Sequence, residues 1–433
     1  DVARYAESCG REVNLPYNQA WRYRDWVIDA FRTNKPFNEF LIEQIAGDLL
    51  PYENEAQHAR AIVGTGFLAV GSRNINENNP KLYALDQADE QIDSVFQATM
   101  GMTMACARCH DHKFEPISQK QYTAVAGIFL STDTRFGVWG GRNTRNGSEP
   151  ISISESSDLP TLPSPWDATE IAKKKKELAK LNKEFDSIVT SIEEKKNNKD
   201  GKDKNRQQDL KKLGSQIQEL EFQLSSLNGD DALRPLAMGA IDKPLTQETK
   251  DTKRERLERF VGVQRRTSFP TIDDSPFFSR GEVGMPGDKI PRGVPDIFGD
   301  AGRFKVPSGT SGRLQLARWI ASPKNPMTAR VAVNRVWHWM MGQGIVDSVD
   351  NFGTTGSRPT HPELLDYLAS RFVEQGWDVQ KLVREIAISR AYQLSSVETN
   401  LESREKDPEN KILWRAKGRR LQAEEIRDAM LRD

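Results

Sequence analysis

The chain has 433 residues, enough for two or three domains of ordinary size. Its 62 lysines and arginines balance its 62 aspartates and glutamates, so no overall field draws it toward nucleic acid or an anionic membrane surface. Hydrophobic residues make up 37% of the sequence, and no run of about 18 apolar residues could cross a bilayer. The composition therefore predicts a multidomain globular chain without a membrane span, and it argues against a nucleic-acid-binding protein.

Helical patterns dominate residues 1–135, which we predict to form the first domain. Residues 1–6 resemble the inside of a helix, and Pro36 is typical of a first helical turn. Ser118 and Gln121 form a capping box that predicts a helix over 119–130. A helical pattern over 84–105 leads directly into residues 106–110. Residues 136–166, rich in Gly, Ser and Pro, then predict an irregular linker.

Two heptad series follow, within residues 167–228. The first series is Ile171, Leu178, Leu181, Phe185, Ile188 and Ile192. The second series is Leu210, Leu213, Ile217, Leu220, Leu224 and Leu227. Because the polar run 195–206 separates them, we predict an antiparallel coiled-coil hairpin with arms of roughly 38 Å. Such a hairpin is a candidate binding surface for a protein partner.

The rest of the sequence predicts a loop-rich segment and a second helical domain. Residues 229–312 are rich in Gly, Pro and charge and predict loops with a few short strands. Residues 313–433 predict helices over 314–321, 327–341, 362–374, 379–392 and 423–431. A capping box at Thr360–Glu363 and an N-cap at Asp378 begin two of these helices. The predicted fold class is therefore mainly α, with two helical domains joined by a loop-rich region and a protruding hairpin.

The most specific chemistry in the sequence lies in Cys106-Ala107-Arg108-Cys109-His110. Two thiols at C-x-x-C-H spacing reach the vinyl groups on one porphyrin edge, and the adjacent histidine lies beneath the iron. We therefore predict covalent haem c at Cys106 and Cys109, with His110 as the proximal iron ligand. This chemistry predicts a periplasmic or otherwise extracytoplasmic protein.

Other interpretations of the two cysteines stay open. A thioredoxin-like C-x-x-C requires a βαβ setting that the sequence lacks, and a disulfide between Cys106 and Cys109 would be strained. Zinc is the stronger rival, because His110 and His112 add two further ligand types, although four donors within seven residues crowd a tetrahedron. The alternative function is a non-redox binding or scaffold protein, with the hairpin as its interaction arm and the two cysteines holding zinc or forming a structural bridge.

The sequence does not identify a distal haem ligand. His112 lies only two residues from His110, and so short a peptide cannot wrap around the porphyrin to the opposite face. The other candidates are His338, His361, His58 and Met285. Packing roles compete with ligation at His338, which lies between two tryptophans, and at His361, which lies at a helix start. A five-coordinate iron that binds a small ligand is equally compatible with the motif.

Four acidic residues lie along the helical pattern before the motif: Asp86, Asp89, Glu90 and Asp93. Spacings of three and four place most of them on one face. We expect this face to be solvated or paired with arginines, rather than to bind a metal. The candidate partners are Arg22, Arg24, Arg108 and Arg135.

Several stretches resemble the planctomycete-type cytochrome-c-like domain, a family of unknown biochemical function found in planctomycetes and related bacteria. The matching stretches are residues 1–5, 21–28, 44–51 and 106–116, the last reading CARCHDHKFEP. The second half is similar to the companion C-terminal domain of the same proteins, through residues 312–319, 325–337, 361–366 and 419–429. The resemblance implies more sequence at both ends, with a signal peptide and an upstream small cytochrome domain. Two residues depart from the pattern: Trp339 stands where members often have histidine, and Cys9 replaces a polar residue.

The leading hypothesis is thus a mono-haem c-type protein for electron transfer or for a haem-dependent redox reaction. A redox protein, or the upstream cytochrome domain, is the expected partner. The sequence contains no G-x-S-x-G elbow, phosphate-binding G-x-x-x-x-G-K-[ST] loop or H-E-x-x-H motif. Whether the protein is an enzyme stays open; if it is one, we expect a haem-dependent oxidoreductase.

Overall fold

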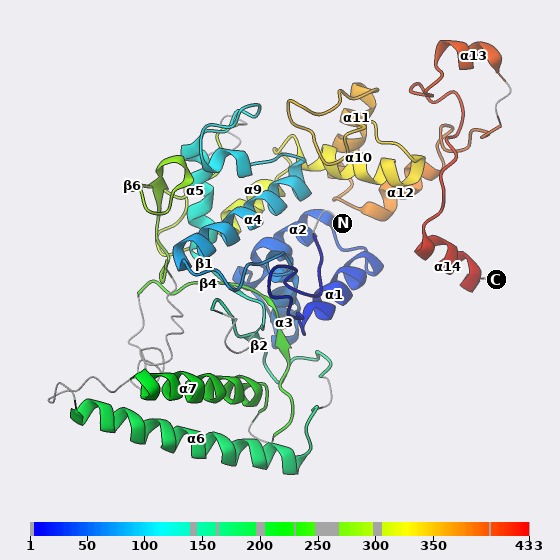
Figure 1. The fold of residues 1–433 in the computed structure, drawn as a ribbon. Coiled ribbons are helices and arrows are strands. Elements are labelled where there is room, and N and C mark those ends of the chain that lie inside the picture. The colour runs from blue at the N-terminus through cyan, green and yellow to red at the C-terminus, as the bar shows by residue number, and fades with distance from the viewer. Residues whose placement is uncertain are drawn as a thin grey trace.

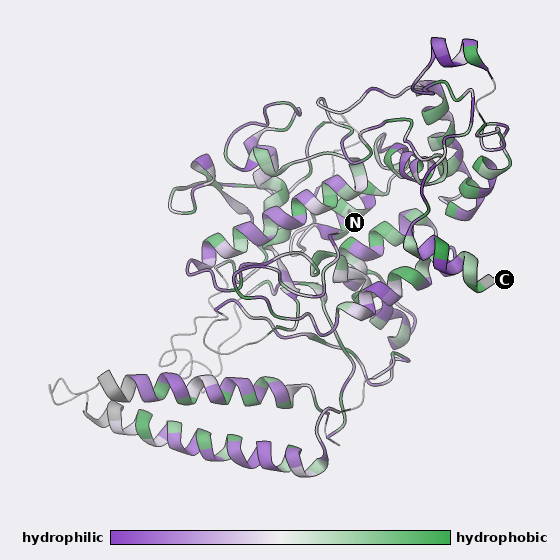
Figure 2. Ribbon diagram, turned by 45° about the vertical axis from the view of Figure 1, so that its right-hand side comes forward, coloured by the Kyte–Doolittle hydropathy of each residue, from purple (hydrophilic) through white to green (hydrophobic). Residues whose placement is uncertain are grey.

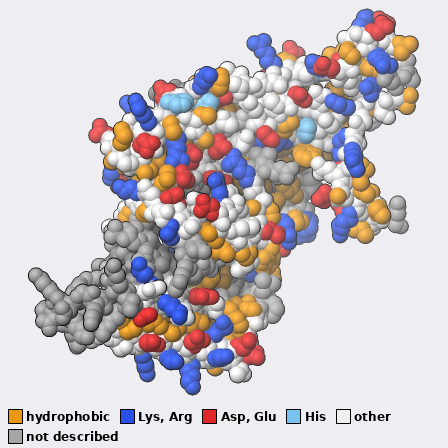
Figure 3. Space-filling view, in the orientation of Figure 1, with side chains coloured by type: hydrophobic (Ala, Val, Ile, Leu, Met, Phe, Trp, Pro, Cys, Tyr) orange, Lys and Arg blue, Asp and Glu red, His pale blue; other side chains and the backbone are white. Residues whose placement is uncertain are grey.

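A computed structural model describes residues 4–138, 145–161, 164–195, 204–228, 231–246, 268–297, 305–397 and 400–432. Most of the regular structure is helical, and the described strands form small two-stranded sheets. The prediction of a mainly α chain is confirmed. No described helix has the length and apolar character needed to span a membrane. Acidic and basic side chains are interspersed on the face in Figure 3, in keeping with the formal net charge of zero.

The N-terminal helices pack around a common apolar cluster (Figure 1). They are α1 (Ala20–Arg32), α2 (Phe37–Ala46), α3 (Glu55–Gly64), α4 (Pro80–Met100) and α5 (Gln119–Leu130), with the 3₁₀ turns η1 (Gly47–Leu49), η2 (Thr65–Leu68) and η3 (Ala105–Arg108). The predicted capping box of Ser118 and Gln121 starts α5. Two predictions were wrong in detail: Arg4–Ala6 are not helical, and Pro36 is the N-cap of α2 rather than part of its first turn.

Helix α4 ends earlier than the sequence pattern suggested. Gly101 follows Met100 with a φ of 62°, the left-handed conformation that terminates helices and that glycine adopts without a Cβ penalty. The chain then turns through 102–104 into η3, which contains Cys106. The motif therefore lies beyond the helix rather than at its end.

Short antiparallel strand pairs connect segments that are distant in the sequence. Strand β1 (Thr132–Arg135) pairs with β4 (Gly239–Asp242), β2 (Ile151–Ser152) with β3 (Leu236–Ala237), and β5 (Ser275–Phe278) with β6 (Pro286–Ile290). Strands β3 to β6 agree with the short strands predicted for the loop-rich segment. Strands β1 and β2 were not predicted from the sequence.

Helices α6 (Ala168–Lys195) and α7 (Lys204–Ser225) lie side by side, apart from the other helices, in both ribbon views (Figures 1 and 2). They share a separate apolar cluster of Phe185, Val189, Leu210, Leu213 and Ile217. Val189 is buried, whereas the predicted core residue Ile188 is only partly buried. The side chain of Ile192 and the connection 196–203 lie outside the described residues.

The C-terminal region is again helical, with α9 (Arg313–Ile320), α10 (Thr328–Met341), α11 (Pro362–Glu374), α12 (Val379–Ala387), α13 (Leu401–Lys406) and α14 (Ala423–Arg432). Helices α10 to α12 share a second large apolar cluster, whereas α9 packs into the N-terminal cluster through Leu316 and Trp319. Helix α12 is shorter than predicted, and the Ser389 hydroxyl bonds the Ile386 carbonyl just past its end. The predicted capping box at 360–363 is absent, because the N-cap is His361 without a side-chain cap.

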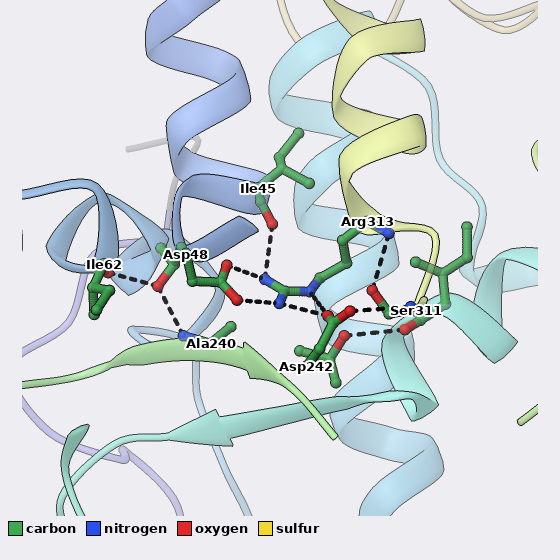
Figure 4. A network of polar contacts seen from close by, with 10 residues as sticks. Ile45, Asp48, Ile62, Ala240, Asp242, Ser311 and Arg313 are labelled. Atoms are coloured by element: carbon green, nitrogen blue, oxygen red, sulfur yellow. Dashed lines mark hydrogen bonds and ion pairs between the residues drawn. The ribbon is translucent and has the colours of Figure 1, made fainter. Parts of the chain in front are cut away.

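A buried ion cluster joins α9 to the N-terminal half (Figure 4). Arg313 has no exposed side-chain surface and bonds both carboxylate oxygens of Asp48, at 2.9 and 2.7 Å. Its Nη2 and Nε also donate to Asp242 Oδ1, at 2.7 and 3.1 Å, and its Nη1 donates to the Ile45 carbonyl at 3.1 Å. Helix α9, strand β4 and turn η1 thus meet at one guanidinium.

Candidate functional site

The C-x-x-C-H motif presents its reactive side chains at the surface. Ala107 has no exposed surface and anchors η3 in the apolar cluster beside Met104. The flanking Cys106 and Cys109 are both exposed and form no disulfide with each other. A 3₁₀ turn with its central residue buried therefore holds two free thiols outward at the spacing that the motif requires.

The His110 ring is oriented by its own loop. Its Nδ1 lies 2.7 Å from the Asp111 carbonyl oxygen. A carbonyl oxygen only accepts hydrogen bonds, so Nδ1 carries the proton and the neutral ring keeps its lone pair on Nε2. This is the tautomer that a histidine needs to bind a metal through Nε2.

His112 has a structural role in the same loop. Its Nδ1 accepts hydrogen bonds from the backbone amides of Phe114 and Glu115, at 3.1 and 2.8 Å. This bonding places the ring proton on Nε2, which is buried without a hydrogen-bond partner among the described residues. His112 therefore stabilises the turn that follows His110.

Arg108, the second variable residue of the motif, joins it to the acidic face of α4. Its Nη1 lies 2.7 Å from Asp86 and 3.5 Å from Asp89. The Tyr122 hydroxyl of α5 donates to the other oxygen of Asp89 at 2.5 Å. Burial raises the pKa of Asp89, and the Tyr122 hydrogen bond opposes that rise. The predicted pairing of the acidic face with Arg108 is confirmed, whereas the predicted partners Arg24 and Arg135 pair with acids elsewhere. Arg4 is a further partner that pairs with Asp93 and Glu90.

The β5–β6 hairpin contacts the motif from a distant part of the sequence. Gln119 Nε2 donates to the carbonyls of Arg108 at 2.9 Å and Phe278 at 2.8 Å, so one side chain joins the motif to β5. Gly281 follows β5 with a φ of +73°, and a Cβ at that position would lie 2.8 Å from Cys109 Sγ. Glycine at 281 thus lets the hairpin approach the thiol closely.

The C-terminal half contributes a second wall to the motif loop. The Phe352 amide donates to the Gly101 carbonyl at 2.7 Å, and the Thr354 amide donates to the buried Glu115 carboxylate at 3.1 Å. A Cβ at Gly353 would lie 1.8 Å from Glu115 Oε1, so any larger residue at 353 would force the carboxylate to move. Arg335 of α10 also donates to the Gln97 and Ala98 carbonyls at the end of α4.

The distal-ligand candidates occupy different surroundings. Among the described residues, no hydrogen bond or ion pair joins His338 or His361 to the motif; His338 lies edge-on to Trp339, and His361 contacts Thr360 Oγ1. His58 stacks on Tyr52 with ring centroids 4.1 Å apart. Met285 is 54% exposed and directly precedes β6, in the hairpin whose Gly281 lies against Cys109.

No preformed metal cage accompanies the motif. Within the described residues, no group of three or more His, Cys, Asp or Glu side chains is arranged to hold a metal ion. Four of the pockets among those residues have linings that do not include Cys106, Cys109 or His110. The two thiols and the His110 ring are exposed, and none of these four pockets offers an apolar cavity for a porphyrin beside them; only the donor chemistry of the motif fits covalent attachment of a haem.

Sequence reasoning missed the residues that position the motif. Gln119 and Glu115 have no distinguishing local pattern, because their partners Phe278 and Thr354 lie far along the chain. The only available signal was the pair of glycines, Gly281 and Gly353, within polar loops, which is typical of close backbone approach.

The chain was compared with known proteins. Neither the curated proteins nor the solved structures gave a match. Residues 1–134 match the family model described as "Protein of unknown function (DUF1549)", and residues 312–432 match the one described as "Protein of unknown function (DUF1553)". The chain thus carries the two paired domains of unknown function that its resemblance to the planctomycete-type proteins indicated.

Proposed function

We propose that the protein binds one haem c through Cys106 and Cys109, with His110 as proximal ligand, and serves in electron transfer or a haem-dependent redox reaction. The observation that carries the proposal is the joint geometry of the motif: two exposed free thiols flank a buried alanine, and His110 has Nδ1 bonded to a carbonyl. Attachment of haem to thiols also implies an extracytoplasmic site of action.

A bound haem would supply a one-electron iron centre, and the residues of this chain would determine its setting. The Asp111 carbonyl holds His110 in the tautomer that presents Nε2, and its hydrogen bond increases the basicity of the ring. The Gln119 amide fixes the backbone of the motif against β5. The surface position of the thiols favours exchange of electrons with a protein partner over chemistry on a deeply enclosed substrate.

The test is a pyridine haemochrome spectrum of the chain, exported by a bacterial host with a c-type haem maturation system. We expect a c-type spectrum that Cys106→Ser and Cys109→Ser each abolish or convert to single attachment. Cys9→Ser is the matched control, since this buried thiol donates to the Val13 carbonyl at 2.7 Å and a hydroxyl can do the same. Colourless wild-type protein from a competent host contradicts the proposal and makes zinc analysis the next step.

We also propose that the chain forms two helical domains and that α6 and α7 form an antiparallel coiled-coil hairpin, which serves as an arm for a protein partner. Support comes from the cluster of Phe185, Val189, Leu210, Leu213 and Ile217 between the two helices, which is separate from the other apolar clusters. Ile217→Asp places a charge in that cluster, and we expect faster hydrogen exchange in α6 and α7 alone. Uniform exchange changes across the chain would contradict an independent hairpin.

The non-redox alternative keeps the hairpin and assigns the cysteines a structural role. It predicts that the wild-type protein and Cys106→Ser are both colourless, and that the substitution changes the free energy of unfolding. The haemochrome experiment therefore separates the two functions directly.

A further inference from the structure

A polar cavity of about 310 Å³ lies beside the motif, on the acidic side of α4. Its lining includes Arg11, Arg73, Asn74, Tyr83, Asp93 and Arg108. Its volume is at the lower end of the range for small-molecule sites. We call it the Arg73 cavity, because Arg73 is the charged residue buried most deeply in its wall.

Arg73 is a buried cation without an ionic partner in the described structure. Arg73 is only 3% exposed, and its guanidinium carbon lies 5.0 Å from the centre of the Phe136 ring. Nη2 donates to the Leu68 carbonyl at 2.9 Å, whereas Nε and Nη1 have no hydrogen-bond partner among the described residues. No described carboxylate lies within ion-pair distance of Arg73, and buried charges without partners are costly.

Three further side chains around the cavity have buried polar atoms that find no hydrogen-bond partner in the part of the chain that the structure describes: Tyr83 Oη, Asn74 Oδ1 and Asp93 Oδ1. The Tyr83 hydroxyl and the Arg73 guanidinium are close enough to interact electrostatically, but they do not complete a well-aligned hydrogen bond. Buried polar groups are nearly always paired. Four such side chains around one hollow therefore indicate a ligand that supplies the missing partners.

The charges of the wall define that ligand. Arg4 pairs with Asp93 Oδ2 at 2.6 Å, and Arg108 pairs with Asp86 at 2.7 Å, so these ions neutralise each other. Glu90, the acid that acts on Arg73 electrostatically, already accepts a hydrogen bond from Ser94. The complementary ligand group for Arg73 is therefore an anion. Asn74 Oδ1 and Asp93 Oδ1 accept hydrogen bonds, so their complementary ligand groups are hydroxyl or amino donors.

We propose that the Arg73 cavity binds a small hydroxylated organic anion, of the hydroxycarboxylate class. The anionic group bonds Arg73 Nε and Nη1, and the hydroxyls bond Asn74, Asp93 and Tyr83. Arg108 belongs to both the cavity and the motif, so the ligand lies next to the proposed cofactor. The binding itself requires no haem.

The test is isothermal titration calorimetry of the full chain with sodium gluconate, which carries one carboxylate and several hydroxyls. Sorbitol and acetate are the neutral and the unhydroxylated comparison ligands. We expect a gluconate Kd below about 1 mM. Tyr83→Phe and Asn74→Ala should each weaken it by about three- to tenfold, the loss typical of one hydrogen bond.

Arg73→Lys keeps the charge but not the fork of donors, and we expect a loss of about tenfold or more. Tyr52→Phe, at an exposed tyrosine outside the cavity, is the matched control. Tyr83→Phe removes only an atom without a partner, so it tests the site even if the Arg73 variant fails to fold. Absence of gluconate binding, equal binding of sorbitol or acetate, or a Kd unchanged in Tyr83→Phe and Asn74→Ala would overturn the proposal.

Discussion

Replacing Arg313 by methionine tests the ion cluster at the junction of the two halves. The change removes a guanidinium that makes five hydrogen bonds to Asp48, Asp242 and the Ile45 carbonyl. It leaves two carboxylates facing each other, with side chains only 5% and 17% exposed. Breaking a buried ion pair on one side typically costs about 3–5 kcal/mol, because the remaining charge has no partner. We expect a loss of that size in the free energy of unfolding at pH 7.

The loss should shrink in acid. Burial raises the pKa of Asp48 even with Arg313 beside it, and removal of the arginine raises that pKa further. A carboxyl with a raised pKa in the folded state binds protons preferentially there, so the variant gains stability as the pH falls. Urea unfolding at pH 7 and pH 5, followed by circular dichroism, measures both effects.

Arg330→Met is the control, because Arg330 is one-third exposed and its partner Asp366 is 56% exposed. Such a surface pair contributes less than about 1 kcal/mol. Adding Asp48→Asn and Asp242→Asn to Arg313→Met should recover part of the loss, since the orphaned charges are then gone. If Arg313→Met loses no more stability than Arg330→Met, the cluster does not hold the halves together and the reasoning is refuted.

Three further predictions concern the site and its surroundings. Gly281→Ala places an alanine at a left-handed φ and brings its Cβ against Cys109 Sγ, so we expect the free energy of unfolding to fall by about 1–2 kcal/mol and the haem content per chain to fall as well. Gly284→Ala is the control and should change neither, because the space around Gly284 is open. Tyr122→Phe removes the 2.5 Å bond to the partly buried Asp89 carboxylate and should lower the free energy of unfolding by about 1.5–3 kcal/mol in urea titrations. Burial lowers the pKa of Lys243 to about 8 in the native chain, from 10.5. Between these pH values the unfolded chain keeps the Lys243 proton and the native chain releases it, so the free energy of unfolding rises with pH. Lys243→Met should flatten that rise, and urea midpoints at pH 7.5 and 9.5 would show whether it does.

Local signals in the sequence predicted the helices well. The capping box at Ser118 and the N-cap at Asp378 begin α5 and α12 as predicted, because both depend on residues within one turn. Helix ends were less accurate: the pattern extended α4 past Gly101, although glycine in the left-handed region is a common stop. The helical pattern of apolar residues continues across Gly101, and this one glycine was not taken as the end of the helix.

The surroundings of the motif could not be predicted from the sequence. The spacing of Cys106, Cys109 and His110 identifies the chemistry, but it says nothing about what covers the loop. The bond from Gln119 to Phe278 and the approach of Gly353 to Glu115 join residues separated by 159 or more positions. Arg73 gave no signal either, since an arginine becomes conspicuous only once its burial is known.

The contact between residues 352–354 and the motif loop bears on how the two paired domains depend on each other. A chain cut before residue 312 keeps every thiol and imidazole of the motif, yet it exposes the Gly101 carbonyl, the Glu115 carboxylate and the last turn of α4. Part of the surface of the first domain is therefore covered by residues of the second. Because each domain completes the surface of the other, both are needed in one polypeptide for structural reasons. Their pairing does not require that each domain carry a separate activity.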